Sequence, residues 1–191
     1  MSVYAEKFLR VDLTEGAWSE VPISEDQVEK WLLGSGFAAK FFYDEMDPEL
    51  DPLDPASPLL TFNGVLAGTF APTGCRSSWC GRSPLTGIWN EANLGNYWGA
   101  ELRFSGYDGL AITGRAERPV YLWSNGLEGT IELRDASHVW GKDYVEAADT
   151  LLEETDRRAQ VAGIGPAGEN LVKFAGVMSG ASDHVRAAAR G

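Results

Sequence analysis

A segment rich in arginine, hydroxyl and glycine residues, 71–87, carries the types of side chain that bind anions. It contains Arg76 and Arg82 together with several serines, threonines and glycines. A guanidinium supplies charge and paired N–H donors, hydroxyls supply further donors, and glycines leave backbone N–H groups open to a ligand. The alternative interpretation is an ordinary polar surface loop, and composition alone favours it.

The following segment, 91–103, alternates glycine and asparagine with aromatic residues. Asparagine and glycine tolerate unusual backbone angles, and the aromatic side chains are suited to walling a flat heterocycle. They are equally suited to the protein core. A third basic element, formed by Arg186 and Arg190, lies close to Gly191, and by itself this segment predicts a frayed tail.

Residues 163–168 match the pattern G-x-G-x-x-G, and Asp183 lies 20 residues beyond Gly163, as in a dinucleotide-binding fingerprint. That fingerprint requires a helix N-terminus next to the pyrophosphate. Residues 171–176 are short, apolar and bounded by glycine, which favours a strand. We therefore interpret the glycines as a tight turn between strands and rank a nucleotide site last.

The remaining reactive side chains form no recognisable catalytic group. Cys75 and Cys80 have the spacing C-x₄-C, a poor metal site without further ligands, and we interpret them as two unligated thiols. His138 and His184 have neither a second histidine nor a serine nucleophile pattern near them in the sequence, so we expect structural or surface roles.

Charge and cysteine content exclude several classes of function. The 191 residues contain 16 Lys and Arg against 28 Asp and Glu, a formal net charge of −12, which repels nucleic acid and anionic membranes. Two cysteines suffice neither for a disulfide scaffold nor for the four thiolates that an iron–sulfur cluster takes. The first residues lack the pattern of a signal peptide, and no segment approaches the roughly 18 apolar residues of a membrane helix. We expect a cytoplasmic protein without a nucleic-acid or membrane partner.

The first third of the chain predicts a hairpin followed by two helices. Residues 7–13 and 18–23 alternate like half-buried strands around a turn at 14–16. Ser24 and Gln27 match a capping box, which predicts a helix over 25–33. A second helix is expected over 37–46. The proline- and aspartate-rich residues 47–58 predict an irregular connector.

Beyond the connector, short apolar runs separated by glycine predict strands, with a helix over 143–155. The expected strands span 59–62, 65–67, 87–89, 109–113, 120–123, 130–133, 160–164 and 171–177. Strands, helices and strands in this order predict an α+β fold with mixed or antiparallel sheets in one domain, 1–191.

Taken together, the segments resemble the N-terminal domain of the aldehyde:ferredoxin oxidoreductases, which carry a tungsten or molybdenum bis-pterin cofactor. The resemblance is collinear and covers nearly the whole chain. The matching residues are 8–14 with Gly16, 45–48, 51–53, 71–74, Arg76, 83–87, 92–95, 99–102, 106–108, 114–121, 134–141 and 165–175.

This resemblance implies an α+β domain that cradles the bis-pterin cofactor of an aldehyde-oxidising enzyme. It implies that Arg76 stands between a [4Fe-4S] cluster and the pterin and that Asn93 and Gly95 contact the cofactor. Arg186 and Ala187 are implied to lie at the cofactor as well, and the backbone carbonyls of Asn93 and Ala187 are implied to meet a Mg²⁺ that bridges the pterin phosphates. Arginine suits phosphate, and exposed carbonyls suit Mg²⁺.

The resemblance also implies partners and missing parts. Ferredoxin or another electron-transfer subunit would receive the electrons, an aldehyde would be the substrate, and a homodimer remains open. The family's cluster cysteines and acid/base groups lie beyond the region that this sequence matches, so we interpret the chain as about a third of the enzyme. The alternative is a stand-alone pterin-binding or assembly module without turnover.

Overall fold

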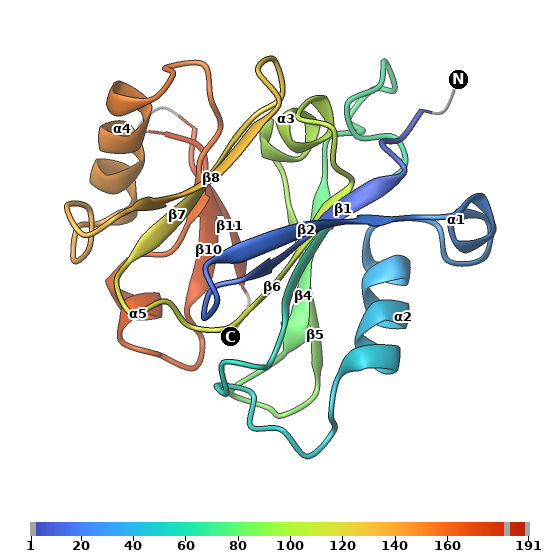
Figure 1. Cartoon of the computed structure of the whole chain (residues 1–191), viewed down its shortest axis with the longest axis horizontal. Helices are drawn as coiled ribbons and strands as arrows, with labels where there is room; N and C mark the ends of the chain where they lie inside the picture. Colours follow the sequence, from blue (N-terminus) through green and yellow to red (C-terminus); the bar gives the residue numbers. More distant parts are fainter. Residues whose placement is uncertain (1–2, 182–183, 190–191) are drawn as a thin grey trace.

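The structure is a computed structural model that describes residues 3–181 and 184–189. Its largest element is a six-stranded sheet with the strand order β2-β1-β6-β3-β4-β5 (Figure 1). These strands are β1 (Lys7–Asp12), β2 (Ala17–Pro22), β3 (Leu59–Asn63), β4 (Ser77–Arg82), β5 (Trp89–Leu94) and β6 (Gly109–Thr113). Neighbouring strands pair antiparallel except β1 and β6, which run parallel.

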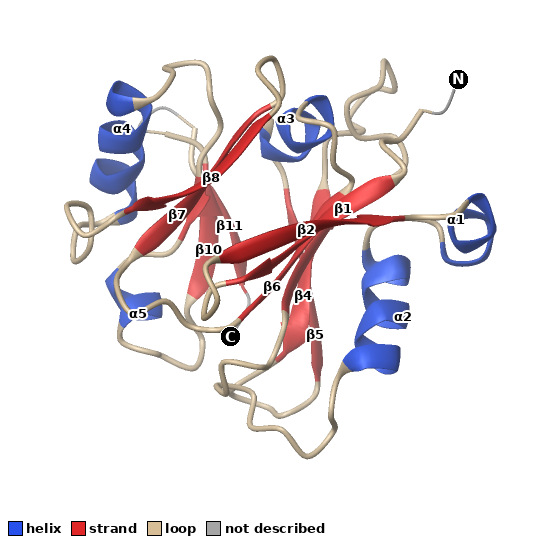
Figure 2. Ribbon diagram, in the orientation of Figure 1, coloured by secondary structure: helices blue, strands red, loops and turns tan. Residues whose placement is uncertain are grey.

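Two smaller sheets and five helices complete the described part of the chain (Figure 2). One sheet is the hairpin β7 (Val120–Asn125) and β8 (Thr130–Asp135); the other has the order β11-β10-β9, with β9 (Ala162–Gly163), β10 (Gly176–Ser179) and β11 (Arg186–Ala189). The helices are α1 (Glu25–Trp31), α2 (Ser35–Glu45), α3 (Trp98–Phe104), α4 (Tyr144–Glu154) and α5 (Pro166–Glu169). The predicted α+β class is confirmed.

One face of the six-stranded sheet is covered by α1 and α2. Phe8 of β1, Phe37 of α2 and Phe62 of β3 meet edge to face, with ring centroids 4.9–6.0 Å apart. All three rings are nearly inaccessible to solvent. Such aromatic pairs add to the free energy gained by burying apolar area, so this cluster fixes the helices on the sheet.

The opposite face carries the two smaller sheets. Leu9 and Leu110 of the large sheet pack against Leu122 and Leu133 of the β7–β8 hairpin. Near the other edge a second cluster joins two strands of the large sheet to β10 and β11; its buried members are Trp79, Leu94, Val177 and Ala188. Because side chains of a strand alternate between faces, β1, β3, β4, β5 and β6 contribute to both layers.

The predicted capping box at Ser24 is confirmed, and Asp143 caps the helix expected over 143–155. Ser24 Oγ accepts the Gln27 backbone N–H, and the Gln27 side chain accepts the Ser24 N–H, which completes a capping box before α1. Asp143 caps α4 by accepting the Glu146 N–H at 2.9 Å. These bonds satisfy backbone donors that have no partner within the helix.

A buried ion pair fixes the segment between β3 and β4. Arg103 of α3 lies 2.8 Å from Asp108, and the two residues are 8% and 0% exposed. The guanidinium also donates to the backbone carbonyls of Val65, Ala67, Gly64 and, at 3.1 Å, Val3. The sequence predicted a strand over 65–67; this prediction is wrong, because Arg103 holds these carbonyls in a series of turns.

The structure corrects other element predictions in the same region. Residues 77–82, interpreted as part of a polar loop, form the interior strand β4, and 87–89 is mainly the turn before β5. The prediction of a strand over 171–177 is also wrong, because the strand β10 begins only at Gly176. Hydrophobic alternation missed β4 since all but its last residue are buried although several are polar or small.

No helix among the described residues is long and apolar enough to cross a membrane.

The Tyr107 phenol forms a hydrogen bond with the carboxylate of Glu20 in β2. Tyr107 donates its hydroxyl to Glu20 Oε1 at 2.8 Å, and Lys7 donates to the same oxygen at 2.7 Å. Burial and this hydrogen bond raise the pKa of Tyr107 from 10.0 to about 12.

Replacing Asp108 by Ala should strongly destabilise the fold. The substitution leaves the Arg103 charge buried without its counter-ion, so we expect a loss of about 3–5 kcal/mol in the free energy of unfolding. Urea denaturation measures this loss. As a matched control, Glu132→Ala removes the exposed partner of Arg134 and should cost no more than about 1 kcal/mol. Equal losses in the two variants would contradict the assigned role.

Tyr107→Phe should change the pH dependence of stability at alkaline pH. Because the folded pKa of Tyr107 lies above the unfolded value of 10.0, the stabilisation from its neutral phenol is complete below pH 10.0 and is lost as pH rises towards about 12. The parent should therefore exceed Tyr107→Phe in unfolding free energy at pH 8, and the difference should shrink above pH 10. Urea titrations at several pH values provide the test; a constant difference would count against it.

Candidate functional site

The five residues that the resemblance singles out lie on strands β4, β5 and β11 or next to them. Arg76 directly precedes β4, Asn93 is within β5, and Gly95 directly follows β5. Arg186 and Ala187 are the first two residues of β11. The sequence alone predicted a frayed tail at 186–190, whereas 186–189 pair with β10; Arg190 lies outside the described residues.

These residues come together where β4 and β5 of the large sheet meet β11 of the small sheet. Ser77 pairs with Leu94, so their neighbours Arg76 and Gly95 lie at the same end of the β4–β5 pair. The strand β11 contacts β5, and both are edge strands of their sheets (Figure 1). Residues separated by about a hundred positions in the chain therefore share one edge.

A hydrogen bond joins the two strands at this edge. The Asn96 side-chain amide donates to the His184 backbone carbonyl at 2.9 Å, which ties the residue after Gly95 to the segment that leads into β11. Asn96 adopts a left-handed backbone conformation with φ of 78°. Sequence reasoning noted asparagines in this segment but did not single out Asn96.

Gly180 and Tyr144 support the same segment from the other side. Gly180 has φ of +106°, and a Cβ there would lie 2.2 Å from the His184 carbonyl oxygen and 2.6 Å from the Asn96 amide nitrogen. Only glycine permits this approach. The Tyr144 hydroxyl lies 2.7 Å from the Gly180 carbonyl oxygen and 3.0 Å from that of Val161. Burial raises the pKa of Tyr144, so this hydroxyl stays protonated as a donor.

The site residues leave polar groups accessible. Arg76, Asn93, Arg186 and Ala187 are all exposed. The Asn93 amide donates to Glu91 at 3.2 Å, and Arg186 donates to the carbonyl of its neighbour Val185 at 3.0 Å. Among the described residues, no atom outside Gly95 and its two chain neighbours lies within 4 Å of the position that a Cβ would take at Gly95, so the space in front of this glycine is open.

Arg82 does not belong to this site. Its Nε donates to the Gly87 carbonyl, and its Nη1 donates to the carbonyls of Pro48 and Leu50, each at 2.7 Å. The guanidinium thus ties the 47–58 connector to the turn before β5. Of the two arginines in the 71–87 segment, only Arg76 remains a candidate for binding an anion.

The glycine pattern at 163–168 lacks the structure of a dinucleotide site. The helix α5 that follows has only four residues, and β9 and β10 pair antiparallel. A Cβ at Gly168 would lie 2.8 Å from the Ile164 Cβ, so this glycine permits close packing. The strand expected over 171–176 does not form, so it is no argument against a dinucleotide site. The antiparallel pairing of β9 and β10 is such an argument, because the fingerprint requires a parallel βαβ unit. Asp183 lies outside the described residues.

Metal ligation by side chains finds no support among the described residues. They contain no group of three or more His, Cys, Asp and Glu placed to hold a metal ion. Cys75 and Cys80 are not joined in a disulfide, and Cys80 is completely buried within β4.

Comparisons with known proteins identify the family of this chain. Residues 8–191 match the family model described as aldehyde ferredoxin oxidoreductase, N-terminal domain. The chain belongs to this family. The tungsten-containing aldehyde ferredoxin oxidoreductase of Pyrococcus abyssi is 48% identical over 189 residues, and that of Pyrococcus furiosus is 46% identical over 186 residues. These alignments cover 98% and 97% of this chain but only 30% of each relative.

Two further similar proteins are named as a subunit and as part of a complex. An aliphatic sulfonate oxidoreductase, WOR-like subunit, of Pyrococcus furiosus is 34% identical over 195 residues, covering 94% of this chain and 31% of that relative. Among solved structures, the active site complex BamBC of benzoyl coenzyme A reductase, in complex with 1,5-dienoyl-CoA, superposes with a TM-score of 0.94. It is 35% identical, and the match covers 100% of this chain and 28% of that chain.

Asn96→Ala should loosen the start of β11 more than it destabilises the whole fold. Losing the bond to the His184 carbonyl should cost about 1 kcal/mol in unfolding free energy and speed amide exchange over 185–188. Hydrogen–deuterium exchange measured by mass spectrometry reports both effects. The control Asn125→Ala removes a hydrogen bond in the distant β7–β8 turn. Similar exchange at 185–188 in the two variants would show that Asn96 does not position this strand.

Proposed function

We propose that this chain is the N-terminal, cofactor-cradling domain of an oxidoreductase that converts aldehydes to carboxylic acids. The reaction would take place at a tungsten or molybdenum bis-pterin centre, and electrons would pass through a [4Fe-4S] cluster to ferredoxin or another electron-transfer subunit. The observation that carries this proposal is the near-complete match of the chain to tungsten-containing aldehyde ferredoxin oxidoreductases at 46–48% identity.

The β5–β11 edge supports a role in holding a phosphorylated cofactor. Arg76 presents an exposed guanidinium beside Gly95, where open space admits a ligand close to the backbone. Guanidinium groups bind phosphate and other oxyanions through paired charge-assisted hydrogen bonds. In our proposal Arg76, Asn93 and Gly95 contact the pterin cofactor, and Arg186 stands beside it.

The same edge suits a hard cation held by backbone oxygens. Alternate carbonyls of an edge strand point away from the paired strand, and Mg²⁺ prefers oxygen ligands. We therefore propose that the backbone carbonyls of Asn93 and Ala187 would help to hold a Mg²⁺ at the pterin phosphates. When bound, the metal–pterin centre would accept electrons from the aldehyde; this chain would supply its binding surface and exclude water from one side of it.

Cluster ligands must be sought elsewhere in the protein. With two cysteines, one of them buried within β4, this chain cannot supply four thiolates. The chain spans about a third of the length of the curated relatives that it matches. Cluster ligands, substrate contacts and any subunit contact, including a homodimer, are accordingly assigned to residues outside these 191.

Arg76→Ala, introduced into the complete polypeptide that contains this domain, should slow reduction of ferredoxin by an aldehyde substrate. The melting temperature should change little, because the Arg76 side chain is exposed. Stopped-flow reduction and thermal unfolding measure the two effects. Arg115→Ala is the matched control, since Arg115 is also exposed and follows β6 at the opposite end of the sheet. Unchanged reduction kinetics in Arg76→Ala would contradict its assigned role.

Metal analysis of the purified complete polypeptide separates this function from its alternative. Tungsten or molybdenum together with pterin and aldehyde-dependent electron transfer supports the enzyme. Pterin without turnover supports the alternative, a pterin-binding or assembly module. A preparation that contains neither metal nor pterin would refute both hypotheses.

A further inference from the structure

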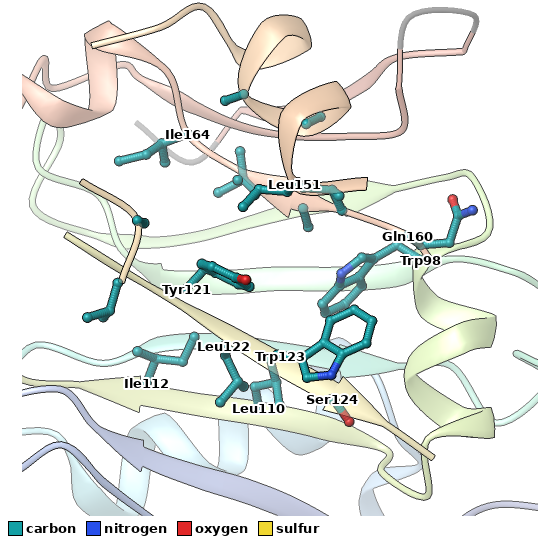
Figure 3. Close-up of a pocket in the computed structure, with 18 of the residues that line it drawn as sticks. Trp98, Leu110, Ile112, Tyr121, Leu122, Trp123, Ser124, Leu151, Gln160 and Ile164 are labelled. Carbon is teal, nitrogen blue, oxygen red and sulfur yellow. The ribbon is translucent and has the colours of Figure 1, made fainter. Parts of the chain in front are cut away.

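A cavity lies between the large sheet, the β7–β8 hairpin and α4 (Figure 3). Tyr121 and Ser124 both line it, although side chains alternate along a strand and these two lie on opposite faces of β7. The Trp123 ring, another part of the wall, already carries the Arg134 guanidinium, 5.3 Å from the ring centroid. The walls thus belong to both faces of the hairpin, and the cavity is not one ligand-sized space.

A second hollow, which we call the α2 groove, lies far from the proposed cofactor site. It has a volume of about 360 Å³ and lies between the end of α2 and the turn that joins β4 to β5. Arg82 pairs with Trp89 at this end of the two strands, whereas Ser77 pairs with Leu94 at the other end. The groove and the arginine-bearing edge therefore occupy opposite ends of the β4–β5 pair.

The wall of the α2 groove is apolar and largely aromatic. Phe42 and Tyr43 of α2 and Trp89 of β5 line it, together with Met46 and Pro48. Phe42 and Trp89 meet edge to face, with ring centroids 5.0 Å apart. Aromatic side chains and methionine are enriched where proteins bind one another, because they offer a large contact area.

Exposed apolar side chains extend this wall to the surface. Tyr43 is 86% exposed, and Leu85 and Ile88 of the β4–β5 turn are 60% and 68% exposed. Ile88 lies in the chain between two residues of the wall, Gly87 and Trp89. Neighbouring apolar side chains that remain in water around a groove are typical of an interaction site.

Arg82 holds the groove in shape without a partner. Its guanidinium binds the connector through the carbonyls of Pro48 and Leu50 and binds the turn through that of Gly87, each at 2.7 Å. Docking therefore need not order either segment, which lowers its entropic cost. Because Arg82 also lines the groove, it would repel a cation inside it, so the group that enters must be uncharged.

The margin of the α2 groove is acidic. Residues 41–75 contain six acidic residues and no Lys or Arg. Two of the six are paired with basic residues from other parts of the chain. Asp47 and Glu49 flank Pro48 of the wall, and neither forms an ion pair within the described residues. Carboxylates at the margin favour a partner that carries positive charge around its contact.

We propose that the α2 groove docks a basic segment of a partner protein, with an uncharged apolar side chain inside the groove and Lys or Arg side chains opposite Asp47 and Glu49. A second copy of this chain fits poorly, because its net charge of −12 brings like charges together. The proposal does not depend on the oxidoreductase function, since the groove uses other residues than the cofactor site.

Fluorescence anisotropy with three labelled octapeptides tests this proposal on the complete polypeptide that contains the domain. The peptides KKGLFGKK, EEGLFGEE and KKGSSGKK differ from one another in their charge or in their apolar centre. KKGLFGKK should bind saturably, and each of the other two should bind at least about tenfold more weakly. Absence of saturable binding by KKGLFGKK, or equal affinity of either other peptide, overturns the proposal.

Variants at exposed positions locate the binding. Tyr43→Ser should weaken KKGLFGKK about tenfold, whereas the control Phe174→Ser removes an exposed aromatic side chain outside the groove and should retain the parent's affinity. Glu49→Lys should weaken it about fivefold, and Glu15→Lys, the same change of charge in the β1–β2 turn, should have a smaller effect. Unchanged affinity in Tyr43→Ser, or equal weakening by the two charge variants, overturns the proposal.

Sedimentation of the same polypeptide tests the competing occupant. The parent and Tyr43→Ser should show the same oligomeric state, because the groove docks a different protein. Self-association that Tyr43→Ser abolishes would assign the groove to a second copy and overturn the proposal.

Discussion

The buried ion pair between Arg103 and Asp108 is the constraint on which much of the remaining structure depends. Asp108 directly precedes β6, the interior strand that pairs parallel with β1 and antiparallel with β3. It accepts the Glu6 backbone N–H at 2.8 Å, while Arg103 binds carbonyls of the segment between β3 and β4. That segment ends at Arg76, so a pair far from the surface determines where the exposed arginine stands.

The two faces of the large sheet are covered differently. A phenylalanine cluster packs α1 and α2 onto one face, and the α2 groove of about 360 Å³ lies beside α2 and Trp89 on this side. The opposite face carries two separate small sheets, which are not hydrogen-bonded to each other in the described part of the chain. The junction of β5 and β11, which is proposed to hold the cofactor, and the cavity bounded by the β7–β8 hairpin and α4 both lie on this side of the large sheet.

Local signals predicted some elements well and missed others for identifiable reasons. The Ser24 capping box, the 7–23 hairpin and the helix capped by Asp143 depend on neighbours within a few positions, and all were found. The strand β4 was missed because its serines, cysteine and glycine show no alternation; it is buried by α2 on one side and β10 and β11 on the other. The role of Arg82 as a backbone clamp also required partners more than 30 positions away.

The sequence by itself determined the α+β class, the helix caps and, through its resemblance, the family to which the chain belongs. Hydrogen bonds between neighbours, hydrophobic periodicity and collinear motifs encode these features locally. Only the tertiary structure decided that Arg76, Gly95 and Ala187 share an edge, that Arg82 does not, and that Asn96 joins β5 to β11. It also created the cavity around Tyr121. Such features arise from strand pairing and layer packing between distant segments, and no local pattern specifies which distant surfaces meet.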